Sequence, residues 1–170
     1  RETEGLLAPA VLGYIYRKHL YGTNLDLKRL TLEDLRPIAL SYLKAKRIPH
    51  VLGTEQTAKA LAEKYGADVE KARFADVFGA DDEIYNAILW HTTGKANMTL
   101  LEKVIYLADY IEPNRDFDGV EDLRKVVWED LDKGLEMGLA MTVEEMEQMG
   151  NPVHHNTLQA LEYLRGHTHE

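Results

Sequence analysis

Cysteine is absent from this 170-residue sequence. Its absence excludes disulfide bridges, thiolate zinc sites and iron–sulfur clusters within these residues. The sequence also lacks an apolar run of the length that spans a bilayer, and its first residues, Arg1-Glu-Thr-Glu, form neither the basic nor the apolar region of a signal peptide. We therefore expect a cytoplasmic protein without a membrane partner.

Basic residues are outnumbered by acidic ones. The sequence has 20 Lys and Arg against 29 Asp and Glu, a net charge of −9 and a pI of about 5.3. This balance argues against binding to a nucleic-acid polymer or an anionic membrane. A small substrate that bears phosphate stays compatible with it, because a bound metal ion supplies local positive charge. The length and the 45% hydrophobic content fit one globular domain, or one domain with an appendage.

Helical signals cover almost the whole chain, and no pair of strands is evident. Apolar residues recur at helical spacing from 84 to 91, Thr99 and Glu102 form a capping box, and Gly66 and Gly150 are placed to end helices. The segment 119–149 is also helical in pattern, as one piece or two. The sequence predicts an all-α fold.

Two candidate metal ligands lie on consecutive predicted helices. His91 extends the apolar stripe of one helix, and Asp109 lies on the next helix, which Pro113 ends. A third candidate, His50, follows Pro49 at a helix entry. Neutral imidazole and carboxylate together suit zinc, iron or manganese, but spacing alone leaves open whether these side chains converge. The alternative is that both histidines are hydrogen-bonded core residues and that Asp109 forms an ion pair.

Two stretches of the chain resemble the YqeK-like HD-domain hydrolases. The first is Arg47-Ile-Pro-His50-Val-Leu-Gly53 with the residues up to Asp68, and the second runs from Trp90 through Asp109-Tyr-Ile-Glu-Pro-Asn-Arg115. The resemblance extends from about residue 31 to the C-terminus. It implies an all-helical HD fold and symmetrical hydrolysis of diadenosine tetraphosphate to two ADP. It also implies one or two divalent transition-metal ions, with iron expected.

The resemblance implies roles for individual residues. His50, His91 and Asp109 match the family's metal ligands, and Asp109 is also the predicted catalytic residue. In the implied mechanism, metal-bound hydroxide attacks a phosphorus atom of the polyphosphate bridge. We expect the substrate contacts to come from a short loop and from one cation after the Asp109 helix: Thr93, Gly94, Lys95 and Arg115. The Thr93-Gly94-Lys95 run is too short to count as a phosphate loop by itself. The expected partner is a dinucleoside polyphosphate, and a homodimer is the oligomer to test.

The chain departs from the family at one place. The His-Asp pair that names the HD fold is absent, although the helical segment 69–75 leads directly to it in the family. Here Ala75 is followed by Asp76-Val-Phe-Gly79, which resembles a much later family segment. We therefore expect additional residues between 75 and 76 in the natural protein. A true deletion is the alternative, but it would remove core helix together with the metal ligands.

The first residues carry a second resemblance. Leu7 to Gly22 is similar to the C-terminal end of bacterial nicotinate mononucleotide adenylyltransferases. This implies a fusion connected with NAD biosynthesis: an adenylyltransferase-like tail at 1–22, a linker at 23–30 and the HD hydrolase at 31–170. Three alternatives remain: an HD phosphohydrolase of another nucleotide, a non-catalytic helical module fused to the adenylyltransferase, and an ordinary amphipathic helix at 1–22 packed on the domain.

Overall fold

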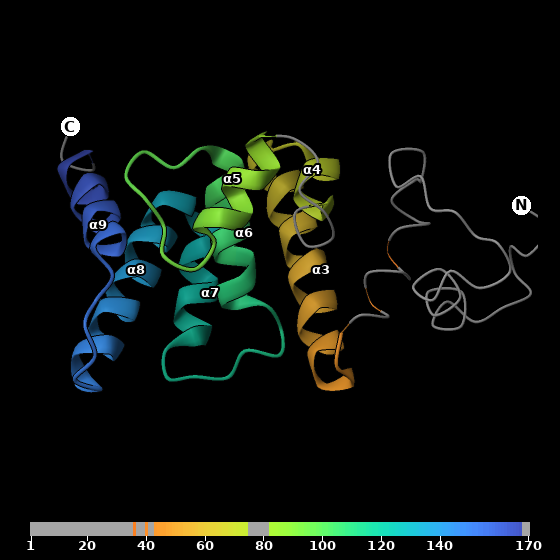
Figure 1. Ribbon diagram of the computed structural model, residues 1–170. Coiled ribbons are helices and arrows are strands. Elements are labelled where there is room, and N and C mark those ends of the chain that lie inside the picture. Colours follow the sequence, from red (N-terminus) through yellow and green to blue (C-terminus); the bar gives the residue numbers. More distant parts are fainter. Residues whose placement is uncertain (1–35, 37–39, 41–42, 75–81, 168–170) are drawn as a thin grey trace, which may run out of the picture. The chain divides into compact units, whose positions relative to one another are not determined.

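A computed structural model describes residues 36, 40, 43–74 and 82–167 (Figure 1). The chain divides into two units, Arg1–Pro49 and His50–Glu170, and the hydrophobic core of the described residues lies in the second. The predicted tail at 1–22, the predicted linker at 23–30 and the junction between 75 and 76 lie outside the described residues.

Every regular element in the described residues is a helix, so the all-α prediction is confirmed. None of these helices is long and apolar enough to cross a membrane. A short 3-10 turn precedes the α-helices, and the elements in chain order are η3 Ala45–Arg47, α3 Ile48–Tyr65, α4 Val69–Phe74, α5 Asp82–Trp90, α6 Leu100–Ile111, α7 Val120–Glu129, α8 Leu131–Gln148 and α9 His155–His167.

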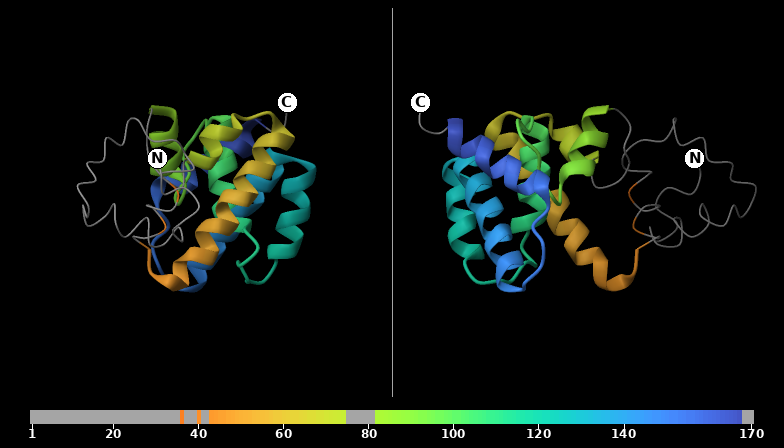
Figure 2. Two further views of the ribbon diagram at one scale, coloured as in Figure 1. Left: turned by 90° about the vertical axis from the view of Figure 1, so that its right-hand side faces the viewer. Right: turned by 60° about the vertical axis from the view of Figure 1, so that its left-hand side comes forward.

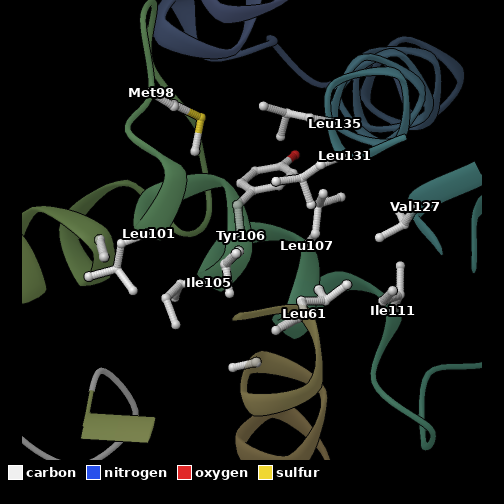
Figure 3. Packing of buried hydrophobic residues seen from close by; sticks show 14 of the residues in the cluster. Leu61, Met98, Leu101, Ile105, Tyr106, Leu107, Ile111, Val127, Leu131 and Leu135 are labelled. Carbon is white, nitrogen blue, oxygen red and sulfur yellow. The ribbon is translucent and has the colours of Figure 1, made fainter. Parts of the chain in front are cut away.

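Helix α6 forms the centre of this core. Its predicted capping box is present: Thr99 Oγ1 accepts from Glu102 N, and Glu102 Oε2 accepts from Thr99 N. It packs against α4, α5, α7 and α8, and Figure 3 shows Leu61 of α3 on one side of it and Leu131 and Leu135 of α8 on another. Because neighbours surround it, α6 buries more of its circumference than one apolar stripe.

Helices α7 and α8 pack closely because the chain supplies a glycine where they meet. Asp130 caps α8 by accepting from the backbone N–H groups of Asp132 and Lys133. A Cβ on Gly134 would lie 2.8 Å from the Cα of Val127, so only glycine permits this approach. The predicted helical segment 119–149 is therefore two helices, and α9 then packs on α8 (Figures 1 and 2).

The loop between α6 and α7 is held in place by Arg124 of α7. Its guanidinium donates to the carbonyl of Ile111 at 2.9 Å, that of Glu112 at 2.8 Å and that of Arg115 at 3.0 Å. The last carbonyls of a helix, such as that of Ile111, have no partner within the helix, and Arg124 supplies one. The Glu112 carbonyl also accepts from the Arg115 N–H at 2.9 Å, which closes the turn after α6. The segment that follows Asp109 is thereby fixed in one conformation.

Candidate active site

His50, near the start of α3, meets Asp109, near the end of α6. His50 Nε2 lies 3.0 Å from Asp109 Oδ1, and the two side chains are 19% and 25% exposed. The structure thus brings together two of the three predicted metal ligands, which are 59 positions apart in the sequence. Both atoms remain within reach of solvent, as a site that receives a substrate requires.

A buried carboxylate, Glu112, holds the other side of the His50 ring. Its Oε1 lies 3.1 Å from His50 Nδ1, and the side chain is 1% exposed. Its Oε2 accepts from the backbone N–H of Asn114 at 2.7 Å and from the Asn114 side-chain amide at 2.8 Å. Burial would raise the pKa of Glu112, but the hydrogen bonds from Asn114 and His50 together lower it below its usual value. Glu112 therefore remains ionised and fixes the orientation of the ring.

His50 has a carboxylate oxygen beside each of its two ring nitrogens, an arrangement that favours added positive charge. A neutral imidazole carries one hydrogen, and Glu112 is placed to accept it from Nδ1. Nε2 then presents a lone pair towards Asp109 Oδ1, which is also an acceptor, only 3.0 Å away. Two acceptors at this distance require a second proton on the ring or a cation between them. Histidines that bind metal ions are commonly oriented in this way: one ring nitrogen donates to a carboxylate, and the other is directed at the metal.

Arg115 completes the cluster from the α6–α7 loop. Its Nη2 donates to Asp109 Oδ2 at 2.8 Å, and its Nε donates to the Asp109 carbonyl at 2.9 Å. The two oxygens of Asp109 are thus divided between His50 and Arg115. The Arg115 side chain is 39% exposed, so it lies where a phosphate group in solvent can approach it. Of the four predicted substrate contacts, it is the one that lies beside Asp109.

The other three predicted substrate contacts lie near the opposite end of α6. Lys95 Nζ is 3.1 Å from Glu102 Oε1, a buried carboxylate seven residues, or about 10 Å, along the helix from Asp109. The Thr93 carbonyl accepts from Thr157 of α9, and Gly94 is buried with φ +66°. These contacts account for the three residues as parts of the loop and the capping box.

His91 does not join His50 and Asp109. Its Nδ1 lies 2.5 Å from the Ile88 carbonyl, and its Nε2 lies 3.2 Å from Thr92 Oγ1. Within 43–74 and 82–167, no group of three or more histidine, aspartate or glutamate side chains is placed to hold a metal ion. The described residues therefore fit a metal only in part: His50 Nε2 and Asp109 Oδ1 face each other, and no third ligand stands beside them.

Glu112 belongs to the His50–Asp109 cluster, and the sequence analysis did not single it out. A signal was present, because an acidic residue directly after a helix opposes the helix dipole and needs another reason to be there. We expect Glu112→Gln to lower kcat/KM of the natural protein by about 10- to 100-fold, because the amide keeps the shape but loses the charge that orients His50. Steady-state hydrolysis kinetics measure this effect.

The matched control for that experiment is Glu129→Gln, which changes an exposed acid at the end of α7. Activity should be unchanged in the control. Equal activity of the two variants would show that Glu112 has no part in the site.

Comparison with known proteins gives three curated relatives, each named symmetrical bis(5'-nucleosyl)-tetraphosphatase. The Bacillus subtilis protein is 32% identical, with 78% of this chain and 96% of the relative covered. The Halalkalibacterium halodurans protein is 32% identical, with 69% and 88% covered. The Staphylococcus aureus protein is 28% identical, with 79% and 94% covered. No protein-family model matches the chain.

A solved structure agrees with these relatives. The crystal structure of a predicted HD superfamily hydrolase involved in NAD metabolism, from Clostridium acetobutylicum, matches with a TM-score of 0.74 and 34% identity. The match covers 81% of this chain and 98% of that one.

The matches to the relatives contain long gaps in this chain. The match to the Bacillus subtilis protein extends over 179 positions, which exceeds the 170 residues of the chain, yet only 78% of the chain takes part in it. The relative therefore has several dozen positions for which this chain has no counterpart. The same holds for the Staphylococcus aureus protein, with 183 positions and 79% of the chain.

Proposed function

Because the chain belongs to the family of symmetrical bis(5'-nucleosyl)-tetraphosphatases, we propose that it hydrolyses diadenosine tetraphosphate to two ADP. The observation that carries the proposal is the agreement of three relatives with this one name, each matched over 88% or more of its length. The chain is thus a hydrolase of phosphoanhydride bonds with the HD-type helical fold.

The HD hydrolase family implies a divalent metal ion, and we propose iron as the ion to test first. His50 and Asp109 are the proposed ligands in the described residues, on the strength of their opposed acceptor atoms. His91 remains a proposed ligand by its match to the family alone. When bound, such an ion lowers the pKa of a water molecule and offsets the charge of the phosphates.

The residues around the proposed ligands have separate tasks. Glu112 keeps the His50 ring in the tautomer whose Nε2 is free of hydrogen. Arg115 neutralises part of the Asp109 charge and has further N–H donors in a planar fork that matches a phosphate group. A tetraphosphate bridge arriving here meets one fixed guanidinium beside Asp109. This residue is our candidate for positioning the bridge.

We propose that the ligands missing from the described residues belong to a segment between 75 and 76. The support is the several dozen positions that the relatives have and this chain lacks, together with the absence of the family's His-Asp pair. Trypsin cleaves after Arg73 and Lys95, at the two ends of the sequence 74–95. Peptide mapping of the natural protein should therefore not detect residues 74–95 as one uninterrupted peptide. Its detection would establish a true deletion.

We also propose that residues 1–22 are the tail of an adenylyltransferase-like domain. The name of the Clostridium acetobutylicum structure, which connects that hydrolase with NAD metabolism, is consistent with such a fusion. Removal of 1–22 from the natural protein should leave hydrolysis unchanged. Loss of metal or of folded protein on truncation would make this segment part of the hydrolase.

Chromatography of the reaction products tests the function directly. Diadenosine tetraphosphate should give ADP as the one nucleotide product, and a chelator should stop the reaction. Production of AMP together with ATP would mean asymmetric cleavage and would overturn the proposal. A screen of other nucleotides under the same conditions identifies a hydrolase of a different substrate.

A further inference from the structure

A hollow lies beside the His50–Asp109 pair, on the far side of Arg115. It has a volume of about 770 Å³, within the range of roughly 300–1,000 Å³ for small-molecule sites. One wall comes from the end of α6 and the loop after it, and the other comes from the second half of α8. We refer to it as the α6–α8 pocket.

The α6–α8 pocket borders the proposed active site through one residue. Arg115 lines the pocket, and its Nη2 donates to Asp109 Oδ2 at 2.8 Å. A molecule that fills the pocket and extends past this guanidinium therefore reaches Asp109. In a substrate cleaved symmetrically, two phosphates separate each nucleoside from the bond that breaks. With a nucleoside in the pocket, the phosphates attached to it would extend past Arg115 towards Asp109.

The pocket has an aromatic wall. The rings of Tyr110 and Phe117 have their centroids 5.2 Å apart, and Met141 of α8 also lines the space. All three side chains are partly exposed, so their apolar surfaces are available to a ligand. A nucleobase stacks on such a surface without requiring a specific hydrogen-bonding pattern.

The charges of the pocket are unevenly distributed. Arg115, beside Asp109, is the one cation in its lining, whereas four exposed carboxylates line the rest: Asp116 and Asp118 from the loop, and Glu144 and Glu145 from α8. Carboxylates accept hydrogen bonds and repel phosphate, so they suit the hydroxyl groups of a ribose and the amino group of a base. Among these charged groups, only Arg115 attracts phosphate. A nucleoside phosphate is therefore favoured with its phosphates at Arg115, next to Asp109, and with its uncharged nucleoside beside the carboxylates.

We propose that the α6–α8 pocket binds one nucleoside of the substrate. Phe117 and Tyr110 stack with the base, Glu144 and Glu145 accept from the ribose or the base, and Arg115 meets the adjoining phosphates. The assignment rests on the proposed function for the identity of the substrate, but binding of a nucleoside to the pocket requires neither the metal nor turnover.

Calorimetric titration of the natural protein with adenosine and with ADP tests the proposal. Phe117→Leu keeps an apolar side chain but removes the aromatic face, and it should weaken both ligands about tenfold. Glu145→Ala, at an exposed helical position that tolerates alanine, should weaken adenosine severalfold. The matched control is Glu147→Ala, an exposed acid on α8 outside the pocket, which should bind as the wild type does.

Kinetics with diadenosine tetraphosphate separate the pocket from the chemistry. Phe117→Leu should raise KM about tenfold and leave kcat within about twofold, because the base contacts are equal in the ground and transition states. Wild-type binding of adenosine by Phe117→Leu and Glu145→Ala, or no adenosine binding by the wild type at millimolar concentration, would overturn the pocket. If adenosine binds through Phe117 but the tetraphosphate is not cleaved, the proposed function fails and the pocket stands.

Discussion

Asp109→Asn should lower kcat of the natural protein at least about a thousandfold, a loss of about 4 kcal/mol in transition-state stabilisation. The substitution keeps the shape of the side chain and removes its charge. Asp109 Oδ1 faces His50 Nε2 and Oδ2 accepts from Arg115, so both partners lose a charged group at once. An amide also places an N–H where one of these acceptors was. Steady-state kinetics and the metal content of the purified variant measure the effect.

Asp122→Asn is the matched control for this experiment. Asp122 lies on α7, is 72% exposed and pairs with Lys125. The control variant should retain wild-type kinetics, and both variants should retain the helical circular dichroism of the wild type, because neither position is in the core. If Asp109→Asn hydrolyses the substrate at the wild-type rate, the site lies elsewhere in the protein.

Gly53→Ala should destabilise the protein by about 2–4 kcal/mol, although alanine is the better helix former by about 1 kcal/mol. A Cβ on Gly53 would lie 2.2 Å from Glu112 Oε2 and 3.0 Å from Asn114 Nδ2. Glu112 cannot move aside without losing its bonds from Asn114 and from the His50 ring. Hydrogen bonds to a charged group are worth about 1.5–3 kcal/mol each, so their loss exceeds the gain in helix propensity. Denaturant unfolding measures the stability, and activity should fall in parallel.

Gly166→Ala, at a second helical glycine, should have the opposite effect on stability. No atom lies within 4 Å of a Cβ built at Gly166 of α9, so the substitution should stabilise the protein by up to about 1 kcal/mol. Stabilisation at both positions would show that the Glu112 carboxylate moves freely. That result would remove the basis for its role in orienting His50.

The helices of this fold were predictable because local signals determine them. Thr99 and Glu102 form a capping box in the sequence and in the structure, and the glycines at 66 and 150 follow helix ends with positive φ. Local signals gave less information about the packing of α6, which is buried on most sides. The extent of that burial depends on neighbours from other parts of the chain, such as α8 and Leu61 of α3.

The site was predictable in part. Family resemblance pointed to His50, Asp109 and Arg115, and the structure places them in one cluster. Spacing alone could not have done so, because the contact depends on how α3 crosses the end of α6. Lys95 was expected to contact phosphate, but burial of Glu102 beneath the loop creates a need for a neighbouring cation. The sequence shows the charge of Lys95 and not the burial of its partner.

Arg124 has a consequence for how loss-of-activity data on this protein are interpreted. Its guanidinium donates to three carbonyl groups, those of Ile111, Glu112 and Arg115, and to the side chain of Glu121. In a genetic screen for inactive variants, substitutions at 124 should therefore be recovered as readily as substitutions of the proposed ligands His50 and Asp109. Loss of activity in such a variant would reflect a change in the geometry of the loop. The range of residues tolerated at position 124 would therefore measure how strongly the site depends on support from this loop, and not a chemical role for Arg124.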